Sequence, residues 1–156
     1  MKRLFIVLAC MMVAGMAWAK VPAKSELAVS GSYYAPEDGD KVWVADGFIA
    51  MPISDSGKII LGPQVHLSSG TDDALGAVLE WNFLGTNKSG PFLGGNGLYL
   101  QKEIEGLERY SVNGVAGLKI QVGTGGFVKV FASAPVAGAG KDLTKITGNV
   151  GIGIRF

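Results

Sequence analysis

The chain has 156 residues, 14 of them basic and 13 acidic, so its formal net charge at pH 7 is +1. A balance this even gives no electrostatic reason to bind nucleic acid, and the length is that of one domain. Charged residues make up only 17% of the chain, below the roughly 25% typical of soluble domains, and 24 residues are glycine. A domain of this size with a fully wetted exterior would carry more charge.

The N-terminus has the pattern of a cleaved export signal. Lys2 and Arg3 form a basic head, an uncharged apolar run follows, and an Ala-x-Ala sequence ends it. The apolar run is shorter than the roughly 20 residues of a membrane-spanning helix. We therefore expect residues 1–19 to be removed and residues 20–156 to form one domain without cysteine, because Cys10 leaves with the leader.

Beyond the leader, apolar and polar residues alternate in eight segments separated by Gly, Pro, Asn and Asp. The alternation has period 2, which places successive side chains on opposite faces of a strand. The predicted strands are residues 26–34, 42–54, 58–69, 75–84, 92–103, 109–122, 127–134 and 144–156. Because the connections are short, we expect an all-β, eight-stranded, antiparallel, up-and-down barrel.

Two of the predicted strands are irregular. Pro63 lies within the third and cannot donate a ladder hydrogen bond, so we expect a bulge or local irregularity there. The fifth contains Gly94, Gly95 and Gly97, which carry no facing information, so its register is the least defined. We place Tyr99 on its inward face.

The last predicted strand is the most regular. Its alternate apolar face consists of Ile146, Gly148, Val150, Ile152, Ile154 and Phe156, and its other face is polar or Gly. A regular strand with an unpaired edge is a template for aggregation, and closing the sheet into a barrel removes that edge.

The alternation fits a soluble barrel with an apolar interior and equally a membrane barrel with an apolar exterior. The polar faces carry few charges for a surface in water, namely Glu26, Asp46, Glu80, Lys119, Lys129, Lys145 and Arg155. Aromatic residues of the apolar faces fall near strand ends, as interfacial girdles do: Tyr33, Trp43, Trp81, Phe83, Tyr110 and Phe156. Both observations favour the transmembrane barrel.

At this point the chain resembles a known group, the small eight-stranded outer-membrane barrels of the OmpA and OmpX type. The resemblance covers the mature chain as architecture and is most specific at Val150, Ile152, Ile154 and Phe156. In that family a C-terminal aromatic residue after alternating apolar residues is read by the outer-membrane assembly machinery. The resemblance implies export to the outer membrane of a Gram-negative envelope, contact with lipid and lipopolysaccharide, and recognition by that machinery through Phe156.

One group of polar residues has the composition of a hydrolase site. His66 and Ser68 share a face and Glu80 lies on the polar face of the next strand, as a base, nucleophile and orienting carboxylate would. The spacing is similar to that of outer-membrane lipid A deacylases, but the residues after Ser68 differ from theirs. The simpler interpretation is a hydrogen-bonded lumen, and we assign no catalytic, cofactor-binding or metal-binding residue.

The lumen of an eight-stranded barrel is just wide enough for side chains to fill it. We expect the acidic residues Glu26, Asp46 and Glu80 to pair with Lys119, Lys129 and Arg155, because an unpaired buried charge costs several kcal/mol. The large inward residues expected are Tyr34, Phe48, Gln64, His66, Glu80, Tyr99, Lys119, Lys129, Phe131 and Arg155.

These expectations combine into a monomeric, non-catalytic outer-membrane barrel with a plugged lumen, no cofactor, and a structural or surface-interaction role. Two alternatives remain open at this point. One is an outer-membrane lipid-modifying enzyme similar to a lipid A deacylase, and the other is a soluble periplasmic ligand-binding barrel.

Overall fold

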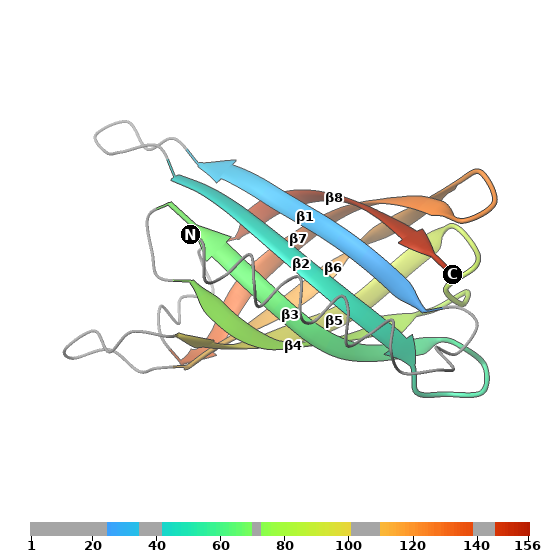
Figure 1. Cartoon of the computed structure of the whole chain (residues 1–156), viewed down its shortest axis with the longest axis horizontal. Coiled ribbons are helices and arrows are strands. Elements are labelled where there is room, and N and C mark those ends of the chain that lie inside the picture. Colours follow the sequence, from blue (N-terminus) through green and yellow to red (C-terminus); the bar gives the residue numbers. More distant parts are fainter. Residues whose placement is uncertain (1–24, 35–41, 70–72, 101–109, 139–145) are drawn as a thin grey trace.

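The structure, a computed structural model, describes residues 25–34, 42–69, 73–100, 110–138 and 146–156, and the predicted leader at residues 1–19 lies outside these ranges. The strands are β1 (Glu26–Tyr34), β2 (Val42–Pro52), β3 (Ile59–Ser68), β4 (Ala74–Asn82), β5 (Gly90–Leu100), β6 (Tyr110–Val122), β7 (Gly126–Gly138) and β8 (Thr147–Arg155). They pair in chain order and β8 pairs with β1, which closes an antiparallel up-and-down barrel (Figure 1). Over the described ranges, no helix is long and apolar enough to cross a membrane.

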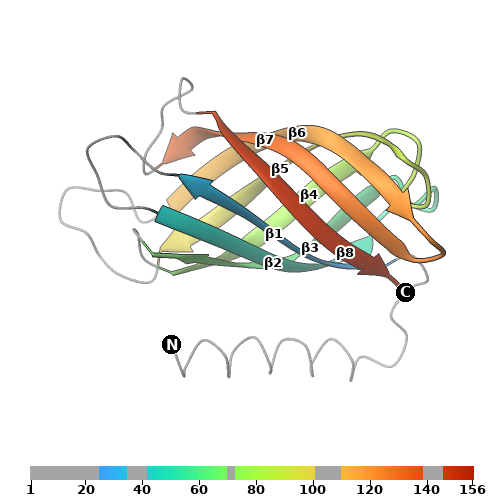
Figure 2. The same ribbon diagram turned by 90° about the horizontal axis from the view of Figure 1, so that it is seen from above.

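The strands cross the barrel obliquely (Figure 2). Followed once around the barrel, the eight registers return to β1 displaced by about ten residues. A displacement of that size corresponds to a strand tilt in the upper part of the roughly 35–45° range of closed barrels. The tilt sets how tall the barrel wall is for a given strand length.

The two ends of the barrel differ in their connections. The turn end carries the C-terminus and the connections β2–β3, β4–β5 and β6–β7, and the loop end is opposite (Figure 1). The β6–β7 connection has only residues 123–125, and Gly123 adopts a φ of 66° there. A positive φ is readily adopted by glycine, which permits so tight a turn.

The polar and apolar faces of the strands separate onto the two sides of the wall. On the outside, the side chains of Val29 and Ile152 are 54% and 66% exposed. Charged residues of the described strands turn inward, and Glu80 and Lys119 are only 2% and 1% exposed. This arrangement is the reverse of a soluble ligand-carrying barrel, whose apolar face lines the interior.

Aromatic side chains lie in two bands on the outer surface. The loop-end band consists of Tyr33, Trp43, Tyr99 and Tyr110, which are joined as cross-strand pairs Tyr33–Trp43 and Tyr99–Tyr110. The turn-end band consists of Trp81, Phe83 and Phe156, with the Trp81 and Phe83 rings stacked 4.5 Å apart. Between the bands the exposed side chains are aliphatic.

The expected inward position of Tyr99 is wrong. Its side chain is exposed in the loop-end band, opposite Tyr110, and its neighbour Leu98 fills the lumen instead. The glycines of β5 carry no facing information, so the sequence did not define the phase of the alternation. The register that forms places the outward-facing residues Tyr99 and Tyr110 opposite one another. The side chain of Tyr34 lies outside the described part of the structure.

Proline perturbs the sheet at two places. The β2–β3 ladder has no pairs between Phe48–Gln64 and Met51–Leu61, around Pro63, which confirms the expected irregularity. A register shift lies between β6 and β7 at Val112 and Asn113, next to Pro135, and was not predicted. β7 continues past this shift to Gly138, four residues beyond its predicted end at Ala134.

Candidate functional site

Five charged side chains form a chain of ion pairs in the turn-end half of the lumen. We call this group the ionic plug, and its members are Glu26, Glu80, Lys119, Lys129 and Arg155. The Lys119 Nζ atom lies 2.8 Å from both Glu26 Oε2 and Glu80 Oε1. Glu80 Oε2 contacts Lys129 Nζ, and Arg155 Nη2 lies 3.1 Å from Glu26 Oε1. Each residue comes from a different strand, so the plug ties five of the eight strands together.

The registers explain why the plug needs both acids. Lys119 and Lys129 are directly opposite one another on β6 and β7, an arrangement that is destabilising for like charges. Glu80 reaches across from β4 and offers one carboxylate oxygen to each lysine. Glu26 lies directly opposite Arg155 and contacts it across the β1–β8 ladder. Each positive charge therefore has an acidic partner.

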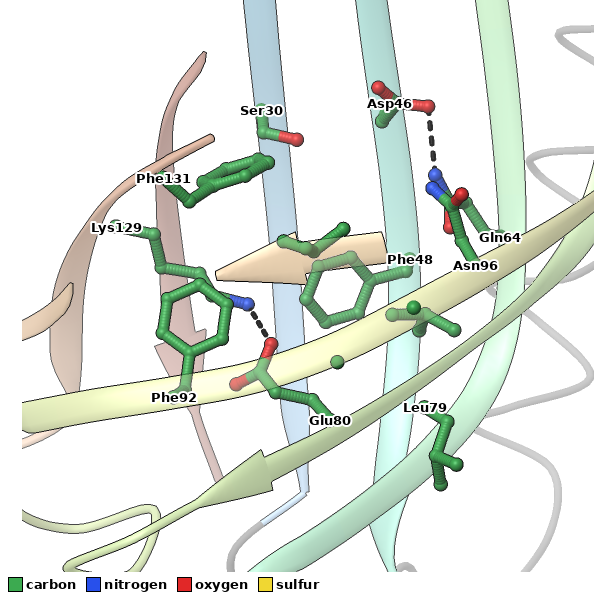
Figure 3. A pocket seen from close by; sticks show the side chains of 14 residues that line it. Ser30, Asp46, Phe48, Gln64, Leu79, Glu80, Phe92, Asn96, Lys129 and Phe131 are labelled. Carbon is green, nitrogen blue, oxygen red and sulfur yellow. Dashed lines mark hydrogen bonds and ion pairs between the residues drawn. The ribbon is translucent and has the colours of Figure 1, made fainter. Parts of the chain in front are cut away.

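Aromatic rings cover the lysines of the plug. The Lys129 ammonium lies 4.8 Å from the centroid of Phe48 and 4.5 Å from that of Phe92 (Figure 3). The Lys119 ammonium lies 5.0 Å from the Phe127 ring. Cation–π attraction and exclusion of water both strengthen the ion pairs beneath these rings.

Two inward glycines make room for these and neighbouring rings. A Cβ atom on Gly153 would approach the Phe127 ring to 2.4 Å, and one on Gly117 would approach the Cβ of Phe131 to 2.4 Å. Both distances are far below van der Waals contact, so the lumen has no room for a larger side chain at these two positions.

The loop-end half of the lumen is built mainly from amides. Asp46 Oδ1 accepts a 2.8 Å hydrogen bond from Gln64 Nε2 and lies 2.9 Å from His66 Nδ1. Asn113 Nδ2 donates to Asn96 Oδ1 at 2.8 Å. We call this group the amide chamber; Asn149, which donates to Ser133 Oγ at 3.0 Å, also belongs to it.

A small cavity of about 40 Å³ lies between the ionic plug and the amide chamber. Phe48, Gln64, Asn96 and Lys129 are among its lining residues (Figure 3). The lining includes both polar and apolar side chains, and a space of this size accommodates a few water molecules. The buried Gln64 Oε1 has no hydrogen-bond partner among the described residues and is a candidate to bind one of them. The cavity is far smaller than the aqueous channel of a porin.

The expected pairing of lumen charges is correct for Glu26 and Glu80 and wrong for Asp46. The register places Asp46 opposite His66, and the two side chains meet in the amide chamber. Sequence reasoning missed this contact. A signal was present, since Asp46 and His66 are equally distant from Ser56 in the β2–β3 turn and a hairpin centred there pairs them.

The three residues considered as a hydrolase site do not come together. His66 lies opposite Ala74 on β4, while Glu80 lies opposite Ile60. The separation along the strand is about 20 Å at roughly 3.3 Å per residue. Glu80 is held by two lysines, and the carboxylate next to His66 belongs to Asp46.

No cluster of three or more His, Cys, Asp or Glu side chains within the described ranges is placed to hold a metal ion. Comparisons of the chain with protein-family models, with curated proteins and with solved structures find no match.

Proposed function

We propose that this chain is an integral outer-membrane β-barrel protein of a Gram-negative cell envelope with a structural or surface-interaction role. The observation that carries the proposal is the outer face of the barrel. In the described strands, the residues that face outward between the two aromatic bands are apolar, Gly or Pro, while the strand charges turn inward. A contiguous apolar surface of this extent supports a location in lipid, because exposing such a surface to water is unfavourable.

The dimensions of the apolar surface support the proposal. Tyr33 belongs to the loop-end band, and the carbonyl of Ser25 accepts a hydrogen bond from the amide of Phe156 in the turn-end band. From Ser25 to Tyr33, β1 rises about 26 Å along the strand, or roughly 20 Å along the barrel axis at the tilt inferred above. This height is close to the roughly 25 Å apolar band of outer-membrane barrels.

The proposed partners follow from the same surface. Outer-membrane lipid and lipopolysaccharide would contact the apolar wall, and the assembly machinery would recognise Phe156. The Phe156 side chain is exposed, while its amide is tied to β1 through Ser25. We propose a monomer exported with a cleaved leader at residues 1–19.

The contents of the lumen support a closed, non-catalytic barrel. The ionic plug and its aromatic cover fill the turn-end half, and every charge of the plug has a partner. His66, the only histidine in the sequence, faces the lumen beside Asp46, where an acyl-chain substrate in the surrounding lipid does not reach it.

Fractionation combined with heat-modifiable gel mobility tests the proposal. The full chain is expressed in a Gram-negative host, and the membranes are separated and run in detergent gels with and without boiling. We expect outer-membrane recovery and a mobility change on boiling, because a folded membrane barrel resists detergent at room temperature. Recovery in the soluble periplasm without such a change would contradict the proposal. Normal outer-membrane levels after deletion of Phe156 would contradict its assigned role in assembly.

A further inference from the structure

The seam between β1 and β8 has the shortest ladder in the barrel. It contains six pairs, from Glu26–Arg155 to Gly31–Val150. The ladders on either side continue toward the loop end, to Tyr34–Val42 between β1 and β2 and to Ser133–Thr147 between β7 and β8. Over the described residues, β1 and β8 therefore share no pairs near the loop end, where the two strands diverge (Figure 2).

The register identifies the backbone groups that border this opening. The amide of Phe156 donates to the carbonyl of Ser25, so every second residue from that pair directs its backbone N–H and C=O across the seam. The same register places Tyr33 opposite Gly148, as a pair that would exchange two hydrogen bonds. Where the ladder stops, these donors and acceptors face each other without that exchange.

Such groups are costly at a membrane-facing surface. A backbone N–H or C=O without a partner in hydrocarbon costs several kcal/mol, and closed barrels normally satisfy all of them. Under the proposed function, the opening lies at the level of the loop-end band, because Tyr33 is part of that band. Aromatic bands lie where lipid headgroups and their linkages meet the acyl chains.

The side chains around the opening leave space for a chain-like ligand. A Cβ atom on Gly148 would meet nothing within 4 Å. The flanking residues Tyr33 and Ile146 are 62% and 68% exposed. Among the described residues, the backbone donors and acceptors at the opening therefore lie beside exposed apolar side chains and have no partner across the seam.

We propose that the loop end of the β1–β8 seam binds a lipid that carries an amide-linked acyl chain. The amide N–H donates to a free carbonyl of the Tyr33 and Gly148 pair, the amide C=O accepts from a free N–H, and the acyl chain lies over Gly148. A secondary amide supplies both a donor and an acceptor, whereas an ester linkage only accepts. The proposal rests on the proposed function.

An extended peptide is the competing occupant, because it could add a strand to the same edges. Within the described residues, the opening spans residues 32–34 on β1 and 147–149 on β8, and it offers one pair, Tyr33 and Gly148, whose backbone groups are directed across the seam. An added strand gains its affinity from several successive main-chain bonds, so the short opening favours the lipid.

The test compares two lipids that differ in their linkage. The mature chain, folded in detergent micelles, is titrated with N-dodecanoylglucosamine and with 2-O-dodecanoylglucose, each bearing the same brominated acyl chain at the C2 position. Quenching of Trp43 reports binding, because Trp43 lies opposite Tyr33, and the variant Trp81→Phe removes the tryptophan of the turn-end band. We expect the amide lipid to bind about fivefold more tightly, the value of one additional hydrogen bond.

A matched pair of glycine variants locates the site. Gly148→Leu fills the proposed position of the acyl chain and should abolish the preference for the amide lipid. Gly97→Leu is the control, since Gly97 also faces open space but is paired on both sides. It should keep the preference.

Equal affinity of the folded parent for the two lipids would overturn the proposal, and that comparison needs no variant to fold. Equal effects of Gly148→Leu and Gly97→Leu would overturn the assignment to the seam. Tight binding of an extended apolar peptide that displaces both lipids would identify the competing occupant and also overturn it. A barrel that fractionates with the outer membrane but lacks the amide preference would refute this inference alone.

Discussion

The same strands form the inner and outer faces of the barrel wall, but among the described residues only the inner face carries charged side chains between the two aromatic bands. Inside, each charged side chain of the ionic plug lies within a few ångströms of an oppositely charged partner. Outside, the described strands present no charged side chain between the aromatic bands. A protein surrounded by water distributes charge in the opposite way. The location of the charges therefore supports the proposal that the outer face of the wall contacts lipid.

Removing an acid from the inner face should have the largest effect on stability. Glu80→Ala leaves Lys129 without its carboxylate partner and Lys119 with Glu26 alone. We expect the free energy of unfolding to fall by about 3–5 kcal/mol, the usual cost of breaking a buried ion pair. Urea unfolding of the barrel in lipid vesicles measures it, and a loss below about 1 kcal/mol would mean that the plug is well hydrated.

Adding a charge to the outer face should have the next largest effect. Leu79 faces outward between the aromatic bands, and Leu79→Arg should lower the free energy of unfolding in lipid by about 2–4 kcal/mol. Thr147→Ser on the inner face is the control and should change it little. If Leu79→Arg folds in lipid as stably as the parent, the two faces have been assigned to the wrong sides.

Two glycines on β8, one facing the lumen and one facing outward, should respond differently to an added methyl group. Gly153→Ala on β8 brings a methyl group against the Phe127 ring and the Leu27 carbonyl, and should cost about 1–3 kcal/mol through overpacking. Gly148→Ala on the outer face of the same strand meets open space and should stay within about 0.5 kcal/mol of the parent. Equal costs in the same unfolding experiment would show that the lumen is not tightly filled.

The smallest effect is expected in the amide chamber. Asn96→Ala removes the acceptor of the Asn113 side-chain hydrogen bond and should cost about 1 kcal/mol. The double variant with Asn113→Ala should cost less than the sum of the two single changes, because the residues share one bond. Strict additivity in a double-mutant cycle would contradict the contact.

Much of the fold could be predicted because apolar and polar residues alternate with period 2, which fixes which side chains share a face of a strand. β1 runs from Glu26 to Tyr34 as predicted, and alternation placed Asp46 and Phe48 on the inner face of β2 correctly. The position of Tyr99 could not be predicted, since the glycines of β5 fit either phase. The register shift beside Pro135 depends on how β7 pairs with β6. The sequence pattern of β7 alone could not predict it.

The candidate site was predictable in composition and less so in its pairings. Burial requires acids and bases of the lumen to pair, and this argument alone anticipated the partners of Glu26 and Glu80. It failed for Asp46 because a pairing depends on height along the barrel. Asp46 lies beside His66 in the amide chamber, away from the three basic residues of the plug.

Conductance in planar bilayers tests whether the lumen is closed, because an apolar wall around a lumen sealed by the ionic plug leaves no path for ions. Purified monomer is inserted into bilayers at moderate salt, and the current is recorded at constant voltage. The ionic plug and its aromatic cover predict no steady conductance. A stable open channel of porin-like conductance from the parent protein would show that the ionic plug does not close the lumen.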